Sequence, residues 1–224
     1  MILNHQHRFL FIHVPKTAGT TVTRALSPLT TFRDIELGGT KYGEAIQERF
    51  AARFDLRKHS TGAMIRAKCP GHIWHRFFVF AFVRNPYARA YSVYRFLRRW
   101  KEGPHHALAT SLDFTDFLHS EEVATNEIEI ARPQTYWLSA DGERLPGLNF
   151  IGRVEDFDRD FSFVLSTIHR RRIDWQDARR DNVSAGTAEW RGEMTPAAAA
   201  RIEQLYASDF EMWEYDRVPL DQAA

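Results

Sequence analysis

The feature that most constrains the fold is the run over residues 77–83, FFVFAFV, which is apolar at every position. A strand with one face in water alternates apolar and polar residues. A continuous apolar run therefore predicts a strand buried on both faces, as at the centre of a parallel sheet. The run ends at the polar turn of residues 84–86, where Pro86 is well placed for the first position of a helix. We predict a strand, a turn and a helix that extends to about Trp100.

Residues 8–21 (RFLFIHVPKTAGTT) repeat this arrangement near the start of the chain. An apolar run ends at a proline and is followed by Lys16, by Gly19, which permits a tight backbone, and by Thr20 and Thr21 at the start of an expected helix. Backbone N–H groups converge in such a turn, the helix dipole is positive at this end, and the lysine adds a full charge. The stretch predicts a site for a phosphate-like or sulfate-like group.

The rest of the chain predicts one more strand and several helices. Residues 149–154 predict a third strand, and a helix over 156–169 has its apolar positions on one face. Shorter helices are expected over residues 41–54, 61–68, 114–118 and 195–206, with irregular segments at 26–39 and 103–112. Alternating strands and helices indicate an α/β fold with a central, mainly parallel sheet flanked by helices. At 224 residues, we expect a single domain over 1–224.

Charge and cysteine content exclude several classes of function. Thirty basic and 29 acidic residues give a formal net charge of +1, so the chain has no overall field for nucleic acid and any basic site must be local. Its one cysteine, Cys69, excludes an internal disulfide and a cysteine-built metal site. No apolar run is long enough for a membrane segment, and no signal peptide is expected. These features predict a cytoplasmic protein that requires no metal, with its oligomeric state open.

Two strand-to-helix corners are basic, and in a parallel sheet ligands bind where loops leave the carboxyl ends of strands. Lys16 follows the first strand and Arg84 follows the central one, with Ser92 further into the helix. Arg84 and Ser92 offer a forked donor pair and a hydroxyl to a second anion. A ligand with two separated anionic groups is therefore expected to span the corners. The first loop lacks the glycine and Gly-Lys-Ser/Thr order of a Walker A sequence, which argues against an ordinary ATP or GTP site.

These two corners resemble the signatures of sulfotransferases that use 3′-phosphoadenosine 5′-phosphosulfate (PAPS), in particular the carbohydrate-sulfotransferase branch and its small bacterial members. HVPKTAGTT (13–21) resembles the 5′-phosphosulfate loop, which is P-loop-like, and FVRNPYARAYSVYRFL (82–97) resembles the 3′-phosphate element with its Arg-x7-Ser spacing. Further similar segments are Lys58-His59-Ser60-Thr61, ARPQTYWL (131–138), FIGRVEDFDRDF (150–161) and SDFEMWEYD (208–216). The resemblance extends over nearly the whole chain.

The resemblance implies a role for each matching residue. Lys16 matches the lysine that contacts the phosphosulfate and stabilises the leaving phosphate, and Arg84 and Ser92 match the 3′-phosphate ligands. Ser184 lies in a segment similar to the loop that closes over the nucleotide. The residues expected to bind PAPS are Pro15, Lys16, Thr17, Ala18, Gly19, Thr20, Thr21, Arg84, Ser92 and Ser184. The implied reaction is in-line transfer of a sulfuryl group to a hydroxyl, or an amine, of a carbohydrate or glycolipid acceptor.

The catalytic base is expected to be His59, because its segment resembles the one that carries the family's catalytic histidine and a neutral imidazole accepts a proton near pH 7. His72, Asp34 and Glu36 remain alternatives. Two other functions also remain: a non-catalytic protein that binds a phosphoadenosine nucleotide, and a small-molecule kinase. Acceptor specificity is expected in the irregular segments 28–40, 101–112 and 139–147, whose composition identifies no sugar, lipid or peptide.

Overall fold

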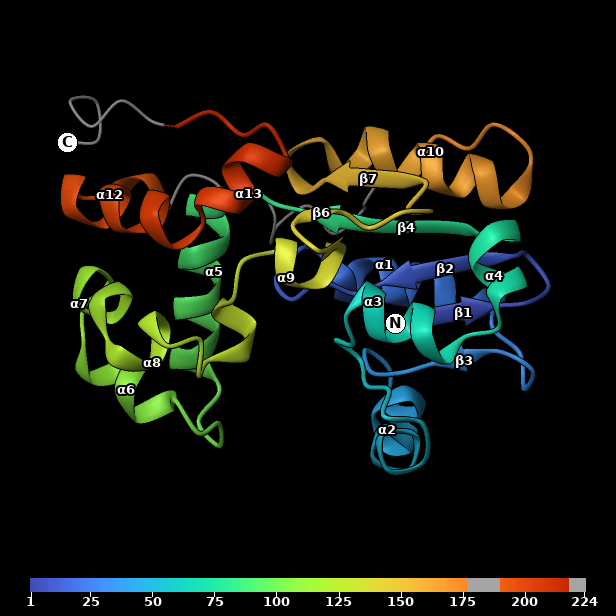
Figure 1. Ribbon diagram of the computed structural model, residues 1–224, viewed down its shortest axis with the longest axis horizontal. Coiled ribbons are helices and arrows are strands. Elements are labelled where there is room, and N and C mark those ends of the chain that lie inside the picture. Colours follow the sequence, from blue (N-terminus) through green and yellow to red (C-terminus); the bar gives the residue numbers. More distant parts are fainter. Residues whose placement is uncertain (177–189, 218–224) are drawn as a thin grey trace. The chain divides into compact units, whose positions relative to one another are not determined.

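The computed structural model describes residues 1–176 and 190–217, which form two compact units (Figure 1). The first, which we call the sheet unit, contains residues 1–83 and 134–176. The second, which we call the helical unit, contains residues 84–133 and the later part of the chain. Because a division into compact units does not decide whether either folds alone, the single domain expected over 1–224 stays a prediction.

The sheet unit is built on a five-stranded sheet in the order β3-β1-β2-β4-β7. Its strands are β1 (Ile2–Asn4), β2 (Phe9–Ile12), β3 (Ile35–Glu36), β4 (Phe78–Val83) and β7 (Phe150–Arg153). β2 pairs in parallel with β4, and β4 with β7, whereas β1 pairs antiparallel with both β2 and β3. Every strand except β1 therefore runs in the same direction, which confirms the mainly parallel α/β sheet.

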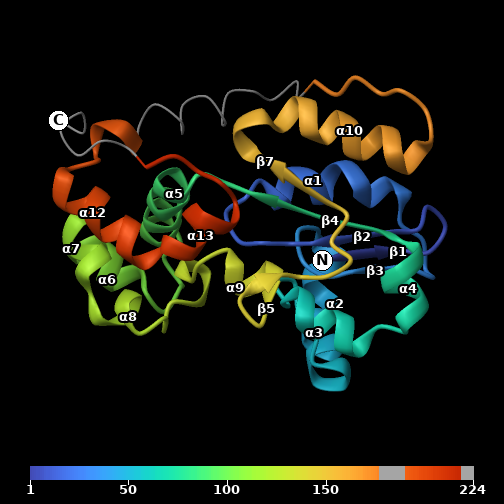
Figure 2. The ribbon, with the colours of Figure 1, turned by 45° about the horizontal axis from the view of Figure 1, so that its top comes forward.

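One face of this sheet carries an apolar core formed with two helices. Helix α1 (Gly19–Leu26) follows β2, and helix α10 (Phe157–His169) follows β7; both lie against the same face (Figures 1 and 2). Alternate side chains of the central strands meet these helices, because successive strand residues point to opposite faces. The fully buried members of this core include Phe9, Phe11, Phe80, Phe82, Val22, Leu26, Phe161 and Val164.

The other face is covered by shorter elements of the sheet unit. A Cβ on Gly62, the first residue of α3 (Gly62–Lys68), would lie 2.3 Å from Leu145 Cδ2 and 3.1 Å from Ile12 Cδ1. Helix α3 therefore packs closely on β2. The remaining elements of this unit are η1 (Ser27–Leu29), α2 (Lys41–Phe54), α4 (Gly71–Arg76), α9 (Thr135–Leu138), β5 (Ser139–Ala140), β6 (Glu143–Arg144) and η3 (Val154–Asp156).

The helical unit packs around helix α5, whose buried tyrosines contact several neighbours. Tyr87 stacks on Trp190 at 5.9 Å, and Tyr94 lies 5.3 Å from Phe117. The helices and turns described here are α5 (Pro86–Arg99), α6 (His106–Ser111), α7 (Phe114–His119), α8 (Glu121–Ala124), η2 (Glu129–Ala131), α12 (Pro196–Leu205) and α13 (Ala207–Met212). No helix in the described ranges combines the length and the apolar character needed to cross a bilayer.

The structure contains several elements that were not predicted from the sequence. Among them are strands β1 and β3, because three and two residues are too few to show a period. Helix α4 begins at Gly71, beyond the helix predicted over 61–68, and α6 occupies part of the predicted loop 103–112. The helices over 41–54 and from Pro196 were predicted correctly, with Thr40 and Thr195 capping them through hydrogen bonds to backbone N–H groups.

Candidate active site

The loop after β2, residues 15–18, which we call the anion loop, has an unusual backbone. Lys16 has φ 67° and Ala18 has φ 59°, so two non-glycine residues adopt the left-handed conformation on either side of Thr17. The Thr17 hydroxyl donates to the Val14 carbonyl at 3.0 Å in the buried base of the loop. Left-handed residues alternating with right-handed or extended ones direct backbone N–H groups into a shared concavity. The strain therefore occurs where an anion cradle was predicted.

Helix α1 begins directly after this loop without a side-chain cap. Its N-cap, Ala18, cannot accept a hydrogen bond through its side chain, and no acidic residue lies in the first turn. The first amide groups of a helix have no partner inside the helix, and the positive end of the helix dipole favours an anion there. Thr20 is exposed and Thr21 is half-buried at this end. The start of α1 therefore has the features of an anion-binding helix N-terminus.

Gly19 is required at the junction because the His13 ring occupies the space beside it. A Cβ on Gly19 would lie 1.9 Å from His13 Nε2 and 2.1 Å from His13 Cδ2. His13 is 3% exposed and stacks on Phe11 with ring centroids 5.4 Å apart. Burial holds the pKa of His13 well below its usual range, and the neighbouring His59 lowers it further. A neutral imidazole therefore lies beneath the start of α1.

His59 contacts His13, which brings it to the base of the anion loop. The two rings meet edge to face at 4.6 Å, and His59 Nδ1 lies 2.8 Å from the His13 carbonyl oxygen. A carbonyl only accepts, so Nδ1 carries the proton of the neutral ring and Nε2 keeps its lone pair. Burial lowers the pKa of His59 to about 3, against the opposing effect of this hydrogen bond. His59 is thus a neutral imidazole with one nitrogen able to accept a proton.

Three contacts hold the backbone that carries His59. The indole N–H of Trp137 donates to the His59 carbonyl at 2.9 Å, and Trp137 is fully buried. The Arg57 N–H donates to the Ser60 hydroxyl at 2.7 Å, which closes the turn around His59. Thr61 then caps α3 by accepting from the Met64 N–H at 3.1 Å. Trp137 therefore supports the position of His59 from the buried interior.

The alternative bases occupy other positions in the sheet unit. His72 is exposed on α4, which precedes the first residue of β4 and so lies at the amino-terminal edge of the sheet, opposite the anion loop. Glu36 is 3% exposed and accepts from Thr30, at 3.1 Å, and from Thr40. Its carboxylate is therefore engaged in holding the β3 turn.

Asp34 is also engaged in the structure. Its carboxylate accepts from the His5 N–H at 2.7 Å and from the Thr31 N–H at 2.8 Å. Burial alone would raise the pKa of Asp34, but these hydrogen bonds hold it below its usual range. Asp34 therefore fastens the β1–β2 turn at the amino-terminal edge, and among the weighed candidates His59 is the one that the structure places beside the anion loop.

The second basic corner belongs to the helical unit. Arg84 follows the last residue of β4 and is half-buried, and Ser92 is half-buried on α5. The Asn85 side chain caps α5 by accepting from the Tyr87 and Ala88 N–H groups at 3.0 and 3.4 Å. The corner thus has the strand, turn and helix expected from the sequence, and the structure adds the Asn85 cap. Ser184 lies outside the described residues.

Arg89, on helix α5, is 1% exposed. Its guanidinium donates to the Ile130 carbonyl at 2.9 Å and lies 6.0 Å from the Tyr206 ring. Burial lowers the pKa of Arg89, whereas Tyr206 and Asp209 oppose that effect. These contacts brace helix α5 against η2 and α12 within the helical unit.

Comparison with known proteins agrees with this geometry. The model of a family described as the sulfotransferase family matches residues 1–216. Carbohydrate sulfotransferase 14 of Danio rerio is 24% identical over 202 residues, a similarity that covers 75% of this chain and 48% of that protein. The chain therefore spans about half the length of this curated relative, and no solved structure matches it. Because the family match extends over nearly the whole sequence, the chain belongs to the sulfotransferase family.

Proposed function

We propose that this protein transfers a sulfuryl group from PAPS to a hydroxyl group of a carbohydrate. One observation carries the proposal: three features lie together in the sheet unit. They are the anion loop, the uncapped start of α1 and the neutral His59 ring against His13. Family membership supplies the reaction class. The carbohydrate acceptor is supported by the printed name of the Danio rerio relative.

The residues around the anion loop fit the 5′-phosphosulfate of the donor. Left-handed Lys16 and Ala18 and the amides from Gly19 to Thr21 offer backbone donors, and Gly19 has no side chain to obstruct them. By resemblance, Arg84 and Ser92 bind the 3′-phosphate, and Ser184 contributes to the nucleotide site. Their contact with the nucleotide is part of the proposal.

Two side chains would perform the chemistry. The bound donor supplies the sulfuryl group and a phosphate leaving group. The ammonium of Lys16 stabilises negative charge on the leaving oxygen, which is the form of catalysis that gives the largest effects in group transfer. His59 accepts the proton of the acceptor hydroxyl at Nε2, while Nδ1 remains bonded to the His13 carbonyl.

The low pKa of His59 in the free protein is compatible with this role. Burial keeps the ring unprotonated, so it is ready to accept a proton at neutral pH. Negative charge brought by the donor would raise the pKa of His59, because a nearby anion favours the protonated form. Binding of the donor would therefore strengthen the base at the stage when it is needed.

The proposal also retains three expectations that concern the wider role of the chain. The acceptor is recognised by the segments 28–40, 101–112 and 139–147. An acceptor that offers an amine, or that is a glycolipid, is a more specific form of the same proposal. No metal ion takes part in the reaction, and no nucleic acid is a partner. The location is cytoplasmic, which cell fractionation would test.

The deciding experiment combines sulfate transfer with nucleotide binding. Purified protein is given radiolabelled PAPS and a library of neutral and acidic glycans, with a phenol and a lipid as other hydroxyl acceptors. We expect labelled product from at least one glycan, loss of product in Lys16→Ala, and loss in His59→Asn, whose amide can still donate to the His13 carbonyl. Lys68→Ala, an exposed position on α3, is the control.

Thermal unfolding separates the other functions. A ligand that binds only the folded state raises the Tm, so adenosine 3′,5′-bisphosphate is expected to raise it and Mg-ATP is not. Binding of the bisphosphate without transfer to any acceptor would identify a non-catalytic binder. A response to Mg-ATP alone would identify a kinase and overturn the proposal.

A further inference from the structure

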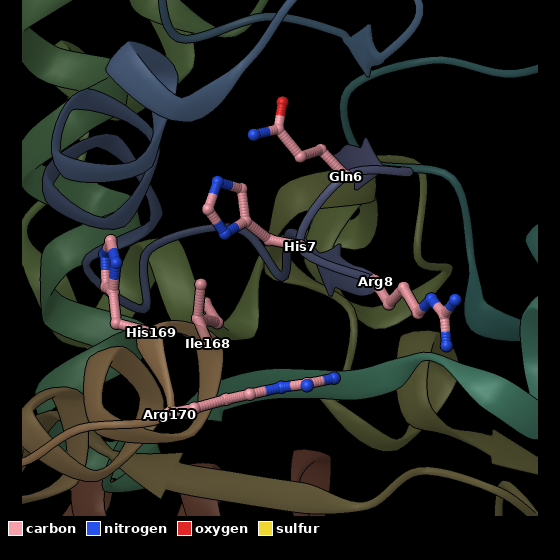
Figure 3. Close-up of a pocket in the computed structure, with 6 residues that line it drawn as sticks. All are labelled: Gln6, His7, Arg8, Ile168, His169 and Arg170. Atoms are coloured by element: carbon pink, nitrogen blue, oxygen red, sulfur yellow. The ribbon is translucent and has the colours of Figure 1, made fainter.

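The sheet unit contains a basic pocket that the proposed reaction does not use. It has a volume of ≈ 430 Å³ and is lined by Gln6, His7, Arg8, Ile168, His169 and Arg170 (Figure 3). The first three residues belong to the turn between β1 and β2, and the last three to the end of α10 and the residue after it. Two segments far apart in the sequence therefore build one pocket.

The pocket lies at the opposite end of β2 from the anion loop. Arg8 directly precedes Phe9, the first residue of β2, whereas Lys16 follows the end of the strand at Ile12. Four residues of strand extend over about 13 Å. Helix α10 follows the carboxyl end of β7 and its last turn reaches this pocket, so the helix returns to the amino-terminal edge of the sheet. The pocket is therefore separate from the predicted donor site.

The walls of the pocket are basic and their charge is not neutralised by neighbours. Arg8 and Arg170 are exposed, and in the part of the chain that the structure describes neither forms an ion pair with a carboxylate. The His7 and His169 rings lie 5.7 Å apart, and burial, followed by the effects of His7 and Arg171, lowers the pKa of His169. Figure 3 shows the two arginine side chains extending in the same direction. Because both residues line this pocket, one ligand can contact both side chains.

Nearby acidic groups are engaged elsewhere. Asp34 accepts from the backbone of His5 and lies 3.6 Å from its ring nitrogen, and Asp174 lies 3.4 Å from Arg172 Nε. Neither carboxylate lines the pocket. A multiply charged anion therefore remains the natural partner for this concentration of positive charge.

Both arginines of the pocket have a backbone conformation that is unfavourable for a residue with a side chain. Arg8 has φ 54° and Arg170 has φ 53°, a conformation in which glycine is the usual residue. A side chain there costs free energy relative to glycine, so its presence calls for a compensating use. Both arginines with this backbone line the same pocket.

We propose that this pocket binds a monosaccharide unit that carries a sulfate or phosphate ester. The planar guanidinium groups of Arg8 and Arg170 bind ester oxygens in pairs, as arginine does with oxyanions. The volume exceeds the needs of a bare ion and falls at the lower end for small-molecule sites. Gln6 and the two imidazoles offer hydrogen bonds to hydroxyl groups, while Ile168 is the single aliphatic wall, which favours a sugar over a nucleobase.

The test is a titration of the full chain followed through its histidine ring signals by NMR, with no nucleotide present. Glucose 6-sulfate and glucose 6-phosphate are the two charged probes, and glucose is the neutral probe. We expect saturable shifts of the His7 and His169 signals with a Kd of about 1 mM or tighter for at least one ester, and none with glucose. The ratio of the two affinities identifies which ester the pocket prefers.

Variants assign the binding to the pocket. Arg8→Gln and Arg170→Gln, which keep the side-chain length and the backbone conformation, are each expected to weaken the preferred ester about fivefold or more. Arg66→Gln, exposed on α3, makes the same change of net charge away from the pocket and is expected to bind as the parent does. Unchanged melting temperatures for all three variants show that each remains folded.

Three results would overturn the proposal. These are the absence of saturable shifts with both esters, shifts confined to His13 and His59, and equal affinities for the parent and both pocket variants. Because no donor nucleotide is used, the result does not depend on sulfuryl transfer, and failure of either proposal leaves the other standing.

Discussion

The two edges of the sheet both carry basic residues in left-handed backbone, yet they differ in what faces an anion. At the carboxyl edge, Lys16 and Ala18 shape a loop that leads into the amino end of α1. At the amino-terminal edge, Arg8 and Arg170 lie at a turn and at the carboxyl end of α10. The helix dipole therefore favours an anion at the first edge and opposes one at the second.

The two edges would therefore bind negative charge through different groups. Backbone amides at the carboxyl edge are held in place by the fold. Anion binding there should therefore be weakened more by a change in backbone geometry than by loss of a side chain. Binding at the amino-terminal edge depends on long guanidinium side chains, whose contacts are exposed to water and screened by salt. For binding of the anion, we therefore expect geometric changes to matter most at the first edge and charge changes at the second, whereas the rate of transfer at the first edge also depends on the charge of Lys16.

The largest effect is expected from Lys16→Ala. The loop keeps its left-handed backbone strain, since alanine also has a Cβ, and loses only the ammonium that stabilises the leaving oxygen. Removal of one such group typically slows the chemical step about 100- to 1000-fold. The measurement is kcat for sulfate transfer from saturating PAPS, with Lys68→Ala as the control. A kcat within a factor of two of the parent would place the charge stabilisation on another residue.

Gly19→Ala is expected to show the importance of geometry at the same edge. The added Cβ would lie 1.9 Å from His13 Nε2, and the buried His13 ring has Phe11 and His59 against it. Overpacking of this kind costs about 1–3 kcal/mol in the free energy of unfolding, and the shifted loop should lose nucleotide affinity.

The matched control for this change is Gly71→Ala. A Cβ on Gly71 meets nothing within 4 Å, so urea unfolding should differ little from the parent. Equal stability and equal nucleotide affinity of the Gly19→Ala and Gly71→Ala proteins would contradict a tightly packed anion loop.

The carboxyl edge was predictable because local sequence determines it. An apolar run, a proline, a lysine and a glycine in order indicate a strand, a turn and a helix start, and the structure confirms those elements. The contact between His59 and His13 joins residues 46 positions apart, and resemblance alone suggested that His59 mattered. The role of His13 was missed because a buried histidine has no local pattern.

The amino-terminal edge was not predictable from the sequence. Arg8 and Arg170 share no motif, and each resembles an ordinary surface arginine until the fold brings β2 and α10 together. Strand β1 leads into the turn that carries His7, and the three residues of this strand are too few to show a period in the sequence. A short range of sequence cannot encode a pocket made from separate segments.

The buried histidines at the carboxyl edge predict how stability depends on pH. His59 has a folded-state pKa of about 3 and an ordinary value of 6.5, so between these values the unfolded chain binds a proton that the folded chain excludes. The contribution of His59 to stability is therefore complete above about pH 6.5 and falls as the pH decreases toward 3. One such group contributes a slope of up to about 1.4 kcal/mol per pH unit.

His59→Asn is expected to reduce this slope while the amide still donates to the His13 carbonyl. Urea unfolding at several values between pH 4 and pH 7 would measure it. The slope that remains comes from His13, whose pKa is also lowered by burial, and from the Met1 amino group, whose pKa burial lowers to about 4. Identical slopes in the parent and the variant would mean that His59 is already protonated in the folded state at low pH.

The smallest effect, and one of opposite sign, is expected at the amino-terminal edge. Arg170 occupies the left-handed position that ends α10, where glycine avoids the strain of a side chain. Arg170→Gly should have a free energy of unfolding about 0.5–1 kcal/mol higher than Arg170→Ala, because relief of strain exceeds the entropy that glycine adds to the unfolded chain and both variants lose the same charge at the helix terminus. Arg170→Ala removes the same charge but keeps the strain, so it serves as the matched control in urea unfolding.

A higher free energy of unfolding for the glycine variant than for the alanine variant, together with loss of sugar-ester binding in both, would show that the arginine is maintained for its charge. Equal stability of the two variants would contradict the claim that the fold gives up stability to present Arg170 at this edge.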